Sequence, residues 1–137
     1  MTVYFDTSSL LKLYVDEPGS AEAAQLLADA TVAATSLLAY PEARAALARR
    51  RREHRMTRTQ LKQARQQLHA DWAAMLVLPL DADLMQRAGD LAESHALRGA
   101  DAVHLSSFER LMSMAEDEDV RFVSADEQLN KAAKRLG

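Results

Sequence analysis

The chain has 137 residues, a length typical of one domain, and 48% of them are hydrophobic, which is enough to bury a core. It contains no cysteine, which excludes disulfides, thiolate metal sites and a cysteine nucleophile. No run approaches the roughly 20 apolar residues that a membrane-spanning helix requires, and no basic leader precedes an apolar run. We therefore expect a cytoplasmic protein with no signal peptide and no membrane partner.

Helical and strand patterns alternate along the first half of the chain. The pattern predicts, in order, a buried strand at 3–5, a short helix at 10–14, a helix capped by Ser20, a weak strand at 32–35 and a helix from 37 into an arginine-rich stretch. The helix after Ser20 is expected to turn Ala23, Ala24, Leu26 and Leu27 inward.

The second half continues the alternation. Thr57 and Gln60 match a capping box, which predicts a helix start. Then follow an edge strand at 76–80, a helix capped by Asp81, a helix at 100–114, an acidic loop at 116–119, a strand at 120–123 and a last helix that a Ser124–Glu127 box begins. Strands alternating with helices predict an α/β fold, with a mostly parallel sheet flanked by helices on both faces, in one domain over residues 1–137.

Four acids fall where such a fold gathers ligand-binding groups. Asp6 directly follows the first buried strand, whereas Glu42, Asp101 and Asp126 each lie in the opening turn of an expected helix. Open parallel sheets bind ligands at the carboxyl ends of their strands, so the four carboxylates can meet there. Each of the three helix-start acids has a structural alternative, because a carboxylate in a first turn also stabilises the helix dipole.

Clustered carboxylates repel one another unless a cation compensates them. Sites built only from oxygen ligands select Mg²⁺ or Mn²⁺, and such an ion can activate water for attack on a phosphodiester. Ser8 lies two residues after Asp6, so its hydroxyl can support Asp6 or instead cap the local backbone. Arg44, two residues after Glu42, is a candidate to reach a substrate phosphate.

Four segments together resemble the PIN domains of VapC toxins. They are Val-Tyr-Phe-Asp-Thr-Ser-Ser-Leu at 3–10, Tyr-Pro-Glu-Ala-Arg-Ala-Ala-Leu at 40–47, Leu-Arg-Gly-Ala-Asp-Ala-Val-His-Leu at 97–105 and Phe-Val-Ser-Ala-Asp-Glu-Gln-Leu at 122–129. No segment is specific alone, but all four occur in the family's order. Ser124 stands where the family often has Thr, and because the hydroxyl is kept, Ser124 is a candidate supporting or substrate-contacting residue.

This resemblance implies a toxin endoribonuclease that depends on Mg²⁺ or Mn²⁺, with Asp6, Glu42, Asp101 and Asp126 as catalytic acids and metal ligands. It also implies an RNA substrate, a cognate VapB-like antitoxin and a homodimer. The fourth acid varies in the family. Asp119 is the alternative to Asp126, but it precedes the last strand and is expected at the wrong end of the sheet.

Two other functions fit parts of the sequence. A PIN-fold module that binds RNA or a protein without cutting it needs no acidic quartet. An aspartyl-phosphate phosphatase with Asp6 as its nucleophile needs a second Asp two residues later, where this chain has Ser8.

The stretch Arg49–Arg65 is compatible with an RNA surface or with a face that meets a protein partner. His104 follows Asp101 by one helical turn and shares its face, which allows a functional role, but a packed or surface histidine is the expected one.

Overall fold

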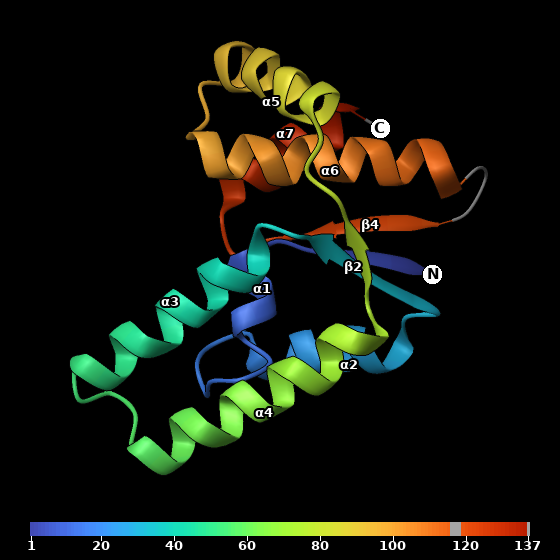
Figure 1. Cartoon of the computed structure of the whole chain (residues 1–137). Coiled ribbons are helices and arrows are strands. Elements are labelled where there is room, and N and C mark those ends of the chain that lie inside the picture. The colour runs from blue at the N-terminus through green and yellow to red at the C-terminus, as the bar shows by residue number, and fades with distance from the viewer. Residues whose placement is uncertain (116–118, 137) are drawn as a thin grey trace.

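In a computed structural model of the chain, which describes residues 1–115 and 119–136, four strands form one sheet in the order β3-β2-β1-β4 (Figure 1). The strands are β1 at Thr2–Phe5, β2 at Val32–Ser36, β3 at Leu76–Leu78 and β4 at Val120–Val123. All neighbouring pairs run parallel, so the carboxyl ends of the strands share one edge of the sheet. This confirms the predicted α/β fold and places β3 at an edge, as Pro79 indicated.

The central strand β1 is buried over its whole length. Because side chains of a strand alternate between its faces, Val3 and Phe5 pack on one side with Leu10 and Leu68, whereas Tyr4 belongs to the core on the other side. A continuous apolar run with both faces covered is the pattern of a central parallel strand. The strand therefore delivers the residue that follows it, Asp6, to the middle of the carboxyl edge.

Within the described residues, helices cover both faces of the sheet (Figure 1). The helices α1 to α4 lie on one face and α5 to α7 on the other. Their bounds are α1 Thr7–Leu11, α2 Ser20–Asp29, α3 Ala39–Arg52, α4 Arg58–Ala74, α5 Ala82–His95, α6 Gly99–Ala115 and α7 Glu127–Leu136. None of these helices, over the part of the chain that is described, is both long and apolar enough to cross a membrane.

Two predicted helix starts are confirmed by their hydrogen bonds. The side chain of Thr57 accepts from the backbone N–H of Gln60, and the Gln60 side chain accepts from that of Thr57, so both halves of the capping box are present. Asp81 caps α5 by accepting from the backbone N–H of Leu84 at 2.9 Å. In both cases local side-chain chemistry was sufficient to locate the first turn.

Three other local predictions were wrong. Gly19, with φ of +95°, occupies the cap position of α2, and the hydroxyl of Ser20 instead donates to the carbonyl of Val15. Ala24 is exposed rather than inward-facing. Asp126, not Ser124, caps α7, because its Oδ1 accepts from the backbone N–H of Gln128 at 2.9 Å. The predicted acidic loop at 116–119 lies outside the described residues except for Asp119.

Replacing Asp81 by asparagine is expected to make the fold less sensitive to acid. Hydrogen bonds from Arg110 lower the pKa of Asp81 from 3.8 to about 2, so the charged form stabilises the fold above about pH 4. That contribution is lost as the pH falls through about 2, whereas the asparagine side chain does not titrate and still accepts from Leu84. The urea midpoints of the two proteins should differ at about pH 5 and converge at about pH 2. A difference that stays constant with pH would contradict this assignment.

Candidate functional site

Asp6 is a buried carboxylate that is held only by uncharged donors. Its exposure is 3%, and it caps α1. Oδ1 accepts from Ser8 Oγ at 2.8 Å, from the Ser9 backbone N–H at 2.9 Å and from Ser9 Oγ at 3.0 Å. Oδ2 accepts from Ser124 Oγ at 2.6 Å. No ion pair in the described chain reaches Asp6. The four hydrogen bonds therefore orient the carboxylate without neutralising its charge.

The register of the sheet explains why Ser124 reaches Asp6. Phe5 of β1 pairs with Val123 of β4, and the Asp6 backbone N–H donates to the Val123 carbonyl at 3.2 Å. The residues that leave the two strands are therefore neighbours. Ser124 in turn accepts from the Asp126 backbone N–H at 3.0 Å, which connects the last helix to the centre of the site.

Glu42 lies in the first turn of α3 and is held from two sides. Thr7 Oγ1 donates to its Oε1 at 2.5 Å, and His104 Nε2 lies 3.0 Å from the same oxygen. Burial acts to raise the pKa of Glu42, but the hydrogen bonds from His104 and Thr7 outweigh it, so the pKa lies below its ordinary value. The carboxylate is ionised at neutral pH. Both bonds fall on Oε1, so neither of them occupies Oε2.

His104 is a buried link between the core and Glu42. The residue is 2% exposed, and its Nδ1 lies 2.8 Å from the hydroxyl of Tyr4. Burial holds the pKa of Tyr4 well above its usual range, so this hydroxyl keeps its proton and can donate it to Nδ1. We assign the ring proton to Nε2 on that basis, where it faces Glu42 and Thr7 Oγ1, the latter at 2.9 Å.

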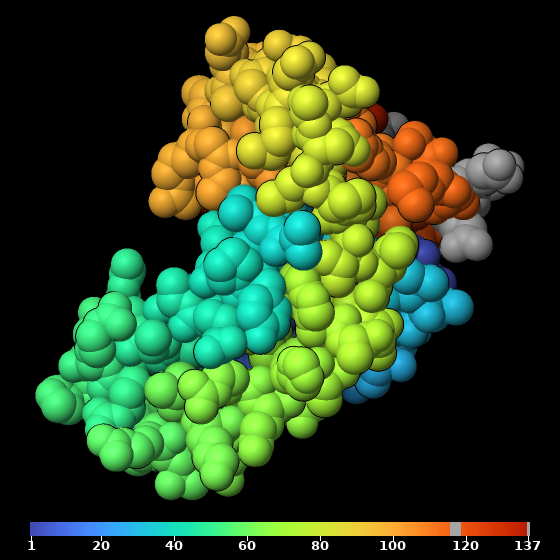
Figure 2. Space-filling model, viewed as in Figure 1, coloured from blue at the N-terminus to red at the C-terminus, as the bar shows by residue number. Residues whose placement is uncertain are grey.

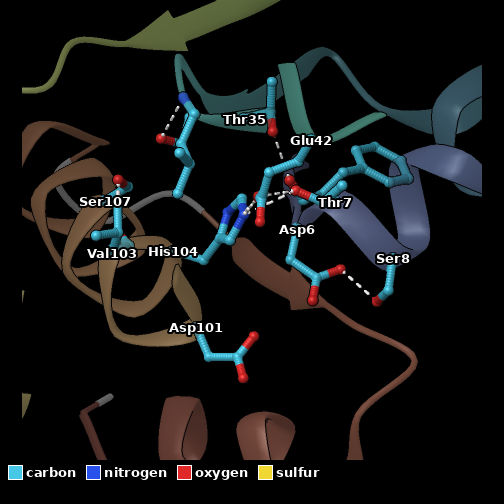
Figure 3. A network of polar contacts seen from close by, with 12 residues as sticks. Asp6, Thr7, Ser8, Thr35, Glu42, Asp101, Val103, His104 and Ser107 are labelled. Atoms are coloured by element: carbon cyan, nitrogen blue, oxygen red, sulfur yellow. Dashed lines mark hydrogen bonds and ion pairs between the residues drawn. The ribbon is translucent and has the colours of Figure 1, made fainter. Parts of the chain in front are cut away.

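Asp101 enters from the other face of the sheet, in the first turn of α6. Its side chain is 18% exposed and pairs with Arg98, whose Nε lies 3.1 Å from Oδ2. Arg98 is 84% exposed, so solvent screens this pair. In Figure 3 the carboxylates of Asp6, Glu42 and Asp101 point into one region between the ends of β1, α3 and α6.

Asp126 stands apart from these three, since its Oδ1 is used to cap α7. Asp119 is further away. It precedes β4, pairs with Arg121, and its carbonyl accepts from the backbone N–H of Thr2, at the amino ends of the strands. This confirms the expectation that Asp119 projects from the wrong end. As the described residues stand, no three His, Asp or Glu side chains are placed to hold one metal ion. Metal ligation by Asp6, Glu42, Asp101 and Asp126 therefore stays a prediction.

The donor set nevertheless fits an oxygen-preferring cation. It consists of carboxylates and hydroxyls, and its most buried member, Asp6, has no cationic partner among the described residues. The ion pair of Asp101 with Arg98 is exposed to solvent, so breaking it to free the Asp101 carboxylate costs little.

Of the three predicted supporting residues, Ser8 and Ser124 contact an acid of the site, and Arg44 contacts Tyr40 instead. Ser8 and Ser124 both donate to Asp6. Arg44 instead donates to the Tyr40 hydroxyl at 3.1 Å and lies over the Tyr40 ring, so a role at a substrate phosphate stays a prediction. Sequence reasoning missed the role of Thr7. For His104 it favoured a packed or surface residue over a role at the site; the residue is packed, and it also reaches Glu42.

Three comparisons with known proteins bear on this site. A family model of the PIN domain matches residues 3–135. Ribonuclease VapC45 of Mycobacterium tuberculosis strain CDC 1551 / Oshkosh is 49% identical over 105 residues, which is 77% of this chain and 73% of that protein. Ribonuclease VapC49 of the H37Rv strain of the same species matches with the same identity and coverage.

Two solved structures share the fold. VapC20 of M. tuberculosis, described as a sarcin–ricin-loop-cleaving toxin, superposes with a TM-score of 0.69 at 19% identity, covering 95% of this chain and 94% of the other. VapBC2 of Rickettsia felis, bound to a DNA fragment from its promoter, gives a TM-score of 0.56 at 12% identity, covering 92% and 100%. At these identities the two matches speak for the fold alone.

Proposed function

We propose, because the chain belongs to the PIN domain family and is a relative of the VapC ribonucleases, that it is a toxin endoribonuclease that uses Mg²⁺ or Mn²⁺. The observation that carries the proposal is Asp6, a buried carboxylate at the carboxyl end of the central strand with no cationic partner in the described chain. Burying a negative charge at that position costs free energy unless a cation neutralises it.

Asp6, Asp101 and Glu42 would hold the ion, and Asp126, whose Oδ1 caps α7, would be the fourth ligand. When bound, a divalent cation supplies Lewis-acid activation of water and neutralises charge at the scissile phosphate. The protein's own residues keep the acids in place. Ser8, Ser9 and Ser124 fix both oxygens of Asp6, and Thr7 with His104 fixes Oε1 of Glu42.

Purified protein incubated with labelled RNA tests this proposal. We expect cleavage in millimolar Mg²⁺ or Mn²⁺, none in excess EDTA, and recovery when Mn²⁺ is added back. RNA that is bound but never cut with either ion would instead support the non-catalytic binding module. A phospho-aspartate trapped on Asp6 would support the phosphatase alternative, which the absence of an acid at Ser8 disfavours.

Millimolar Mn²⁺ is expected to raise the melting temperature. An ion that binds only the native state stabilises it by about 2.7 kcal/mol at a hundredfold excess over Kd, which corresponds to roughly 8 °C for a domain of this size. Differential scanning fluorimetry measures the shift, with Mg²⁺ as a second ion and EDTA as the control. A melting temperature that Mn²⁺ leaves unchanged would contradict a preformed site.

The partners follow from the same family. The similarity to the VapC ribonucleases VapC45 and VapC49 supports a VapB-like antitoxin as the partner of this chain. A homodimer and a cytoplasmic location remain predictions from the sequence. Sequencing the 5′ ends of cellular RNA after brief induction of the protein identifies the RNA that is cut.

A further inference from the structure

Positive charge is concentrated in one part of this acidic protein. Residues 44–65 carry nine Arg or Lys side chains and one acid, Glu53, whereas the remaining 115 residues carry eight basic and nineteen acidic side chains. This segment forms most of α3, the connection to α4 and the first half of α4. In Figures 1 and 2 it is the green end of the molecule that projects away from the sheet. We call residues 49–65 the α3–α4 tip.

Most cations of the α3–α4 tip are free to bind a ligand. Arg50 is the exception, because its side chain is 14% exposed and pairs with Glu17. Arg55 makes a loose, exposed contact with Glu53 at 3.6 Å. The other cations form no ion pair within residues 1–115 and 119–136: Arg49, Arg51, Arg52, Arg58, Lys62 and Arg65. Their charges are therefore not used to hold the fold together.

The geometry of α3 connects the tip to the candidate metal site. Ala39, Ala43 and Leu47 face the core. Glu42 and Arg49 are seven residues apart, so they lie within about 20° of one another around the helix and about 10 Å apart along its axis. Arg49 is exposed on the same face that presents Glu42 to the site. A strand of RNA leaving the site along this face would meet Arg49 within a few nucleotides.

Beyond Arg49 the surface is hollowed. A depression of about 430 Å³ is lined by Arg51, Arg55 and Arg58, together with side chains of the α3–α4 connection. Arginine presents a planar fork of donors that matches a phosphate, and three of them around one hollow create a strongly anion-attracting position. The capping box already uses the backbone N–H groups of Thr57 and Gln60, so the guanidinium groups supply most of this attraction.

The composition of the tip favours a nucleic acid over a protein partner. Protein interfaces are centred on buried apolar anchors. The large apolar side chains that are exposed in the described chain are Leu37, Leu76, Met85 and Met114, and all of them lie outside the tip. The acids of the candidate site also repel phosphates, so a substrate with many phosphates requires a compensating positive surface nearby.

We propose that the α3–α4 tip binds the phosphate backbone of single-stranded RNA, with Arg49 leading from the site and the Arg51–Arg55–Arg58 hollow seating a phosphate. This inference rests on the proposed function for its substrate class, but binding at the tip does not require cleavage. Affinity supplied this way is independent of base sequence and falls as salt rises.

The test measures binding of a fluorescein-labelled, unstructured oligoribonucleotide of about twenty nucleotides by anisotropy, in EDTA so that no cleavage occurs. The variant Arg49→Glu/Arg58→Glu removes two exposed cations that hold no ion pair in the described chain. The control Lys134→Glu/Arg135→Glu makes the same charge change in the last turn of α7. Thermal melts verify that both variants fold.

For single strands the slope of log K against log salt changes by about 0.7 for each phosphate contact. The tip variant is therefore expected to bind about 20-fold more weakly at 0.1 M salt, with a slope smaller by about 1.4, whereas the control changes neither value by a comparable amount. Equal losses in both variants, or no loss in the tip variant, would overturn the proposal.

The result separates this inference from the proposed function. A chain that binds RNA through the tip but does not cut it with Mn²⁺ would retain the inference and overturn the nuclease. A chain that cuts RNA and binds it equally well without Arg49 and Arg58 would retain the proposed nuclease and overturn the inference about the tip. If the tip variant binds RNA normally but loses its antitoxin, the surface belongs to a protein partner and the proposal is wrong.

Discussion

Replacing Asp6 by asparagine is expected to slow RNA cleavage by about 1,000-fold or more, a loss of about 4 kcal/mol of transition-state stabilisation. The side chain keeps its size, and Oδ1 still accepts from Ser9 N–H and Ser9 Oγ. Ser124 can rotate its hydroxyl to accept from the new amide, so the local structure is retained. What is lost is the negative charge that we propose holds the cation.

The same variant should lose the stabilisation by Mn²⁺ while melting at the same or a slightly higher temperature in EDTA, because repulsion among the acids is reduced. Asp90→Asn is the matched control: Asp90 is exposed on α5, and its replacement removes one carboxylate without touching the site. Initial rates on a labelled RNA and melting curves with and without Mn²⁺ measure both effects. Cleavage by Asp6→Asn within tenfold of wild type would contradict the assignment.

Replacing His104 by alanine is expected to have the largest effect on stability, a loss of about 3 kcal/mol in the free energy of unfolding. The ring is buried, and its removal opens a cavity and leaves the hydroxyl of Tyr4 without the acceptor at 2.8 Å. The free energy of unfolding of such domains is about 5–15 kcal/mol, so the variant should still fold. Urea unfolding gives the loss, and His69→Ala on the exposed face of α4 serves as control.

A second readout separates a positioning role of His104 from mere packing. Without His104 the Glu42 carboxylate keeps only Thr7 to fix it, so Mn²⁺ affinity by titration calorimetry should fall along with stability. His104→Gln keeps an N–H near Glu42 and gives up the acceptor for Tyr4, so it should recover Mn²⁺ affinity more than stability. If the alanine variant binds Mn²⁺ as tightly as wild type, His104 only packs in the core and does not position Glu42.

The sequence predicted those parts of the fold and of the site that depend on a single segment of the chain. A continuous apolar run followed by an acid was enough to place Asp6 at the end of a buried strand. Thr57 and Asp81 were located because their capping partners lie three residues away. Glu42 and Asp101 were predicted from their places in the opening turns of two helices and from the family resemblance, and the structure turns both toward the region that Asp6 faces (Figure 3).

The contacts that the sequence could not specify join segments far apart in the chain. Ser124 was predicted as a supporting residue, but it reaches Asp6 because β4 pairs with β1, and no local pattern specifies that neighbour. His104 joins Tyr4 to Glu42 across separations of 100 and 62 residues, so its burial and its hydrogen bonds follow only from the packing of α6 on the sheet. The cap of α2 was wrong because Gly19 adopts a positive φ that leaves Ser20 inside the helix.

The proposed activity requires Asp6, Glu42 and Asp101 to share a divalent cation at the carboxyl edge of the sheet. Anomalous diffraction from crystals grown with Mn²⁺ locates the ion itself. We predict an anomalous peak within about 2.0–2.3 Å of carboxylate oxygens of Asp6 and Asp101, with Glu42 bound directly or through water. A well-occupied Mn²⁺ elsewhere on the protein, with no peak beside Asp6, would contradict a shared site.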